Sequence, residues 1–278
     1  MKKLKLTTYF GLLLVSVACA KSSGGTSTGN PVTVDLKVSS SSQIQTVAMK
    51  AKSLIEEIFF PRALALPPPS LVEATGLAVT LDSAWMSIKE IEFKSTEAAD
   101  GTEGLDIKLR GPFTIDLLAF PAASIGSAQI PQSGIRRFRA TWEKVSASLL
   151  PSAAPAALVD QAILLVFRVN GHKVTVRSDQ GISYEVGGPN ALTPAQNGTL
   201  LVSILTSRLF KRINLSGIST DVTIDAATPF AVTNPCPLID SSANTIYDCF
   251  KGGLRTQANF GEDNGNDGEL NGSDNTVR

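Results

Sequence analysis

The densest group of potential metal ligands is an acidic segment near the carboxyl end, residues 262–274, in which carboxylates are interspersed with glycine and asparagine. Carboxylate oxygens on tight turns are the ligands that Ca²⁺ prefers. On the register of a twelve-residue calcium-binding loop, the segment supplies four candidate ligands: Asp263, Asp267, Glu269 and Asp274. Gly268 fills position six as expected, but Gly265 stands at position three, where a side-chain oxygen is expected. Two interpretations stay open, a calcium site or a solvated acidic tail, and no other cofactor is expected.

The chain lacks the residue sets that common hydrolases and oxidoreductases need. Its single histidine, His172, follows a glycine and precedes an alternating apolar segment, which is typical of a surface residue at a strand end. The Gly-x-Ser-x-Gly spacing of a nucleophile elbow occurs at residues 25–29, but this stretch lies in a segment rich in Ser, Gly and Thr and not between a predicted strand and helix. The sequence contains no zinc-binding His-Glu-x-x-His motif, no phosphate-binding glycine loop and no Cys-x-x-Cys pair. The sequence therefore favours a protein that is not an enzyme.

Two groups of charged residues offer alternatives. Asp82, Asp106 and Asp116 could meet for acid–base chemistry, as in a surface hydrolase that acts on glycans. A stripe of three arginines could hold an anionic glycan, and its members are Arg136, Arg137 and Arg139. Because both groups are interleaved with apolar residues, we expect them on solvated sheet faces or in turns instead.

The first eighteen residues have the order of a bacterial secretory signal. Three lysines precede an apolar run over residues 6–17, which is too short to span a bilayer as a helix of the mature protein. Cys19 follows, where bacterial lipoproteins carry the cysteine that takes a diacylglycerol, although Ser16 replaces the usual Leu or Val. We expect a lipid anchor at Cys19, with an ordinary signal peptide and an incidental cysteine as the alternative.

The residues around the expected anchor also indicate a compartment. Ala20 favours the outer membrane over retention at the inner membrane of a Gram-negative cell. The expected location is the cell envelope, on its periplasmic face or at the cell surface, where conditions are oxidising. Cys236 and Cys249, the other two cysteines, then predict a disulfide, and two free buried thiols are the alternative.

Composition limits the partners. The 278 residues include 25 basic and 25 acidic ones, and loss of the three signal lysines would leave 22 against 25, a net charge of −3. A basic nucleic-acid-binding footprint is therefore absent, and nucleic acid is not an expected partner. About 260 mature residues are enough for one large or two small domains.

The sequence pattern divides the mature chain into segments. Residues 19–34 are rich in Ser, Gly and Thr and predict a flexible leash. Residues 35–70 predict an amphipathic helix followed by a Pro-rich connector, and the helix either docks on the next domain or lies on a membrane surface. The remaining segments are a β-sandwich domain at 71–232, a disulfide-closed segment at 233–260 and the acidic tail at 261–278.

From Gly76 onward, apolar residues alternate with polar ones, as in strands with one buried face. Roughly ten such segments are separated by turns rich in Gly, Pro, Asn and Asp. They predict a mainly β protein folded as an antiparallel β-sandwich.

One strand contains a change of phase. Met86 and Ile88 fall on one phase of the alternation. Ile91 and Phe93 fall on the other. All four can face the same core only if one residue is inserted between the pairs, which predicts a β-bulge near residues 89–90.

Short motifs between residues 79 and 142 resemble those of a bacterial lipoprotein domain family of unknown function, DUF4382. The matching stretches are Val79-Thr80-Leu81-Asp82, residues 88–93, Ile115-Asp116-Leu117-Leu118, Ile130-Pro131-Gln132-Ser133-Gly134 and Phe138-Arg139. The resemblance implies a transthyretin-like sandwich and a lipoprotein, and it implies no activity.

These observations predict a lipid-anchored β-sandwich of the cell envelope that serves as a non-enzymatic binding, adhesion or assembly module. Its ligand is an unidentified protein or glycan, and it contacts the membrane through the lipid. The alternatives are a carboxylate-dependent surface hydrolase acting on glycans and an envelope scaffold that binds only other proteins.

Overall fold

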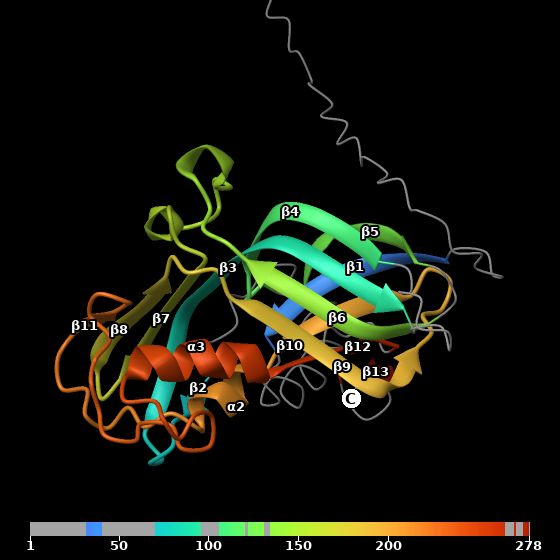
Figure 1. The fold of residues 1–278 in the computed structure, drawn as a ribbon. Coiled ribbons are helices and arrows are strands. Elements are labelled where there is room, and N and C mark those ends of the chain that lie inside the picture. The colour runs from blue at the N-terminus through green and yellow to red at the C-terminus, as the bar shows by residue number, and fades with distance from the viewer. Residues whose placement is uncertain are drawn as a thin grey trace, which may run out of the picture.

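The computed structural model describes residues 32–40, 70–95, 106–119, 122–130, 134–264, 270 and 275–277. The expected signal segment, the anchor Cys19 and the apolar stripe of the expected helix lie outside these residues. Within them the chain is mainly β, as predicted, and two sheets form a curled β-sandwich (Figure 1). None of the helices in this part of the chain is long and apolar enough to cross a membrane.

The larger sheet has eight strands. They are β2 (Ser70–Val72), β3 (Ala78–Ser95), β4 (Asp106–Asp116), β6 (Ile135–Trp142), β7 (Ile163–Val169), β8 (His172–Ser178), β9 (Ser183–Leu192) and β11 (Val222–Ile224). β3 is the spine of this sheet, because its first half pairs with β2 and β7 and its second half pairs with β6. β4 pairs with β3 across the middle and the second half.

The predicted β-bulge is present in β3. The register of β3 shifts between Ile88 and Glu90 against both β4 and β6, so that Lys89 is the inserted residue. The insertion brings the apolar residues on both sides of the bulge to one face, and all of them are buried.

The smaller sheet has five strands in the order β13-β12-β10-β1-β5. They are β1 (Val32–Ser40), β5 (Ala123–Ile130), β10 (Thr199–Ile204), β12 (Ala258–Glu262) and β13 (Asn275–Val277). β1 lies between β10, to which it is parallel, and β5, to which it is antiparallel. β8 and β11 are also parallel, so the sandwich contains two parallel pairs among its mostly antiparallel ones.

Residues 32–40, expected at the junction of the leash and the helical segment, form β1 instead. The reason is visible in the sequence, because Val34, Leu36 and Val38 alternate with polar residues and are all buried. The acidic segment, expected at the start of a tail, begins within β12 and is followed by β13. The core is continuous from Val34 to Phe260, so the residues after 232 belong to the sandwich.

Two α-helices, α2 (Thr206–Phe210) and α3 (Ile246–Thr256), were not expected from the sequence. The buried side chains of α3 include Ile246, Phe250 and Leu254, which stand at helical spacing. Gly253 interrupts this apolar stripe for a packing reason, because a Cβ at this position would overlap the side chain of Leu209 in α2. The two helices are therefore packed closely against each other, and an aromatic ring of each contacts Phe167 of β7.

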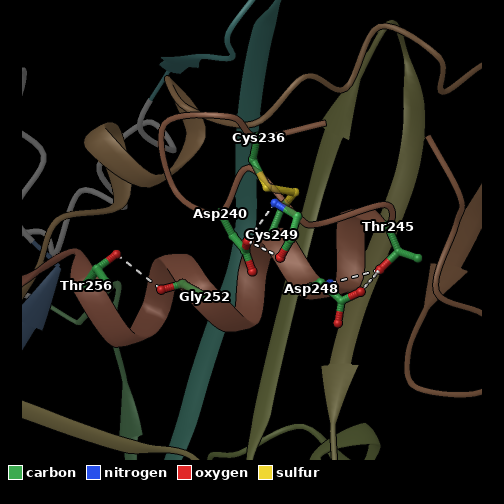
Figure 2. The surroundings of a disulfide bond; sticks show 8 residues. Cys236, Asp240, Thr245, Asp248, Cys249, Gly252 and Thr256 are labelled. Carbon is green, nitrogen blue, oxygen red and sulfur yellow. Dashed lines mark hydrogen bonds between the residues drawn. A yellow bond between two sulfur atoms is a disulfide. The ribbon is translucent and has the colours of Figure 1, made fainter. Parts of the chain in front are cut away.

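The predicted disulfide joins Cys236 and Cys249, whose Cα atoms are 5.8 Å apart, within the range of protein disulfides. Figure 2 shows that it connects the loop before α3 to α3 itself. Thr245 caps the helix, since its hydroxyl accepts a hydrogen bond from the amide of Asp248 at 3.1 Å. The bond and the cap together fix where α3 begins.

The two sheets meet through buried aromatic rings. Phe138 of β6 stacks on Phe260 of β12, with 4.5 Å between ring centroids, and also contacts Phe93 of β3 and Tyr184 of β9. The hydroxyl of Tyr184 donates a hydrogen bond of 2.6 Å to the carbonyl oxygen of Ala258 in β12. Burial raises the pKa of Tyr184, so the phenol stays protonated as this bond requires. The side chain of Phe138 therefore contacts strands of both sheets.

Candidate functional site

The site lies at Ser87, where the strand that pairs with β3 changes from β7 to β6. The amide of Ser87 donates a hydrogen bond of 2.8 Å to the carbonyl of Ala162, directly before β7. The carbonyl of Ser87 accepts one of 3.1 Å from the amide of Glu143, directly after β6. The chain thus leaves the sheet after β6 and returns to it before β7, and both positions hydrogen-bond to Ser87. We call Ser87 the branch point.

Between Glu143 and Ala162 the chain forms a projection that rises above the sheets (Figure 1). It contains two 3₁₀ helices, η1 (Ala147–Leu149) and η2 (Ala156–Leu158). The projection packs on the outer face of β3 and β7 through a small core of its own: Val145, Leu158 and Leu164, with Trp85, Leu150, Ala154 and Val166 around them. No residue from 145 to 159 is charged.

A cleft of about 460 Å³ lies between the projection and the outer face of the sheet, and we call it the branch-point cleft. Its floor is Ser87, Lys89 and Glu90 of β3, which includes the bulge. One wall is Arg110, Gly111 and Pro112 of β4. The opposite wall is Glu143, Lys144, Val145 and Leu149.

The cleft opens here because β3 and β4 are unpaired at this level. Lys89 on β3 and both Gly111 and Pro112 on β4 are skipped in the register. Proline has no amide hydrogen to donate to a neighbouring strand, which suits it to this position. Gly111 is required by close approach, because a Cβ there would overlap the carbonyl oxygen of Ile88.

Three cations and two carboxylates line the cleft. Lys89 pairs with Glu143 across the mouth, with 3.1 Å between Nζ and Oε2. Arg110 pairs with Glu90 more loosely, with 3.7 Å between Nε and Oε2. Lys144 has no ion-pair partner among the described residues, so the cleft carries one more cation than carboxylate. The Lys89–Glu143 pair is exposed and Arg110 joins a half-buried Glu90, so each pair contributes at most about 1 kcal/mol to stability.

Two hydroxyls near the floor lack hydrogen-bond partners in the described structure. The Oγ of Ser87, a residue only 1% exposed, is one, and the Oγ1 of Thr114 is the other. The two residues stand opposite each other on β3 and β4. A buried hydroxyl without a partner is unusual in a folded protein and costs about 1–3 kcal/mol.

We expect Ser87→Ala to leave the free energy of unfolding unchanged or to raise it by up to about 1 kcal/mol, because it removes a hydroxyl that makes no hydrogen bond. Urea unfolding of both proteins measures the difference. Ser178→Ala is the matched control, because the Ser178 hydroxyl is buried and bonds to that of Tyr247 at 2.9 Å, so its removal should destabilise. A loss above 1 kcal/mol in Ser87→Ala would mean that the hydroxyl is bonded within the protein.

The three carboxylates considered for acid–base chemistry are not brought together. Asp106 and Asp116 stand at opposite ends of β4, roughly 30 Å apart at the rise of a strand. Asp82 pairs with Arg168, with 3.1 Å between Oδ2 and Nε. Burial raises the pKa of Asp116, although a hydrogen bond from the amide of Leu118 opposes this. Asp106 and Asp116 are therefore too far apart along β4 to act as one acid–base pair, and Asp82 is ion-paired with an arginine.

The arginine stripe is largely neutralised by glutamates on the same outer face. Arg139 bonds to Glu185 at 2.9 Å and also approaches Glu92, while Arg137 lies 3.2 Å from Glu185. Burial raises the pKa of Glu92, but a hydrogen bond from Lys108 and the nearby cations outweigh burial and lower it. Arg136 is exposed at a register shift of β6. The stripe is a solvated sheet face, as the alternation predicts.

The histidine and the calcium ligands lie away from the cleft or outside the described residues. His172 begins β8, and its Nδ1 is 3.9 Å from Oδ1 of Asp221. Asp263 is buried directly after β12, and its amide donates a hydrogen bond of 2.9 Å to the carbonyl of Thr199. The other three calcium candidates fall in the parts that are not described, and no group of three potential metal ligands occurs in the rest. The calcium site stays a prediction.

A scan against protein-family models found no match, and neither did searches of the curated proteins and of the solved structures. The chemistry of the cleft therefore has to be inferred from the cleft itself. It offers a cation without an ion-pair partner, an aliphatic wall and a buried hydroxyl, and this set suits binding. Sequence reasoning missed this site, and the sequence carries no distinct signal for it, because the uncharged run from 145 to 159 is shorter than the one from 117 to 135, which contributes no residue to the cleft.

Proposed function

We propose that this protein is a lipid-anchored module of the cell envelope that binds another molecule in the branch-point cleft without transforming it. The observation that carries the proposal is the cleft, whose volume of about 460 Å³ is in the range of ligand-binding pockets. The signal segment and Cys19 support the anchor, and the resemblance to DUF4382 lipoprotein domains supports the same compartment.

The residues of the cleft support binding more than catalysis. Ser87 is the only hydroxyl among them, and its Oγ has no base beside it to activate it as a nucleophile. Glu90 and Glu143 each pair with a cation of the cleft, so the cleft holds no carboxylate without an ion-pair partner. The separation of Asp82, Asp106 and Asp116 makes a carboxylate-dependent hydrolase the weaker alternative.

The anchor is tested by Cys19→Ser. The variant has no thiol to carry a diacylglycerol, so we expect it to move from the membrane pellet to the supernatant when cells are fractionated. The unchanged protein should stay in the pellet until detergent is added. A Cys19→Ser protein that remains in the pellet to the same extent would contradict a lipid anchor.

The binding role is tested with the released Cys19→Ser protein and cell envelopes from cells that lack it. We expect the protein to sediment with the envelopes, and we expect the added change Leu149→Asp to reduce the bound fraction about tenfold. Leu238→Asp is the matched control, because Leu238 is the most exposed large apolar residue in the part of the chain that the structure describes and lies outside the cleft. Equal binding of the Leu149 and Leu238 variants would contradict a role for the cleft.

A further inference from the structure

We propose that the occupant of the branch-point cleft is a short extended peptide segment of a partner protein, in which an acidic side chain stands next to an aliphatic one. This inference rests on the proposed function, because it names the ligand class of the same cleft. The charge, the walls and the rigidity of the cleft support it.

The charge of the cleft favours an acidic side chain in the ligand. Of the three cations around the cleft, Lys89 and Arg110 are each paired with a glutamate, whereas Lys144 has no ion-pair partner within the described structure. A ligand carboxylate can pair with Lys144 without breaking an existing ion pair. A cationic ligand would instead have to displace Lys89 or Arg110 from its glutamate, which disfavours it.

The apolar walls of the cleft favour an aliphatic side chain in the ligand. Leu149 is 56% exposed at the edge of the cleft, and Pro112 is exposed on the opposite wall. A branched aliphatic side chain placed between them would bury apolar surface on both sides. No aromatic ring lines the cleft, and sugar-binding sites commonly stack sugar rings on aromatic side chains. The lining therefore favours a peptide over a glycan.

The wall formed by the projection is rigid, which lowers the entropic cost of binding a flexible peptide. Leu149 ends η1, and the projection that carries it is fixed by its own small core and by a β-bridge between Val145 and Val159. Because this wall is already ordered, it loses little conformational entropy when a ligand binds, and more of the contact energy remains as affinity.

The experiment selects peptides from a phage-displayed random library on the immobilised Cys19→Ser protein. We expect the enriched peptides to share an acidic residue next to Leu, Ile or Val. A synthetic peptide with the consensus should bind Lys144→Glu and Leu149→Asp at least tenfold more weakly than the parent, and Leu238→Asp equally well. Selection repeated on Lys144→Glu should replace the acidic residue by Lys or Arg, because the reversed charge prefers a cation.

Two results would overturn the peptide class. One is a selection without a shared sequence, and the other is a consensus peptide whose affinity is the same for the parent, Lys144→Glu and Leu149→Asp. If either occurs while the protein still sediments with cell envelopes in a Leu149-dependent way, the binding module stands and its ligand is of another class. If envelope binding also fails, the proposed function fails with it. Circular dichroism of each variant excludes misfolding as the cause.

Discussion

Replacing Phe138 with alanine is expected to lower the free energy of unfolding by about 3–5 kcal/mol, the range for large aromatic truncations in a packed core. Phe138 is fully buried and contacts Phe93, Tyr184 and Phe260, which come from both sheets. The cavity left by the ring would lie between the sheets, where the backbone of paired strands cannot collapse to fill it. Urea or guanidinium unfolding, followed by circular dichroism, measures the loss.

Phe138→Leu is the matched control for this prediction. It keeps most of the apolar volume and should cost less than about 1.5 kcal/mol. If alanine and leucine at this position cost the same, or if alanine costs below 1 kcal/mol, Phe138 does not join the two sheets as described.

Removal of the Cys236–Cys249 disulfide by Cys236→Ala with Cys249→Ala is expected to lower the free energy of unfolding by about 3 kcal/mol. The bond spans 13 positions of sequence, and a closed loop of this size restricts the unfolded chain by roughly that amount in the chain-entropy view. Both cysteines are fully buried, so lost packing adds to the effect. Unfolding of the oxidised parent and the variant under identical conditions measures the difference.

Leu238→Ser is the control inside the same loop, because Leu238 is 72% exposed and should change stability by less than about 0.5 kcal/mol. Mass spectrometry of unreduced peptides from the parent should show the two cysteines linked. A variant without both cysteines that is as stable as the parent would mean that the bond does not constrain the loop before α3.

The site was less predictable than the fold, and its residues show why. Ser87, Gly111 and Lys144 are unremarkable in their local sequence, and no motif marks them. They meet because β3 changes partners at Ser87, because β4 skips Gly111 and because β6 ends just before Lys144. Each of these events depends on pairing between residues tens of positions apart. Sequence reasoning instead considered Asp82, Asp106 and Asp116, of which Asp106 and Asp116 stand at opposite ends of β4 and Asp82 pairs with Arg168.

The alternation of apolar and polar residues specifies which faces of the strands are buried, because a two-residue period is a local property of the chain. It was enough to predict the β-sandwich and a bulge near residues 89–90, and the Cys236–Cys249 pairing was also predicted from the sequence. Which strands pair with each other is not a local property and is seen only in the folded protein. The insertion of β1 between β5 and β10, and the branch point that opens the cleft, depend on long-range hydrogen bonding, which leaves no periodic signal in the sequence.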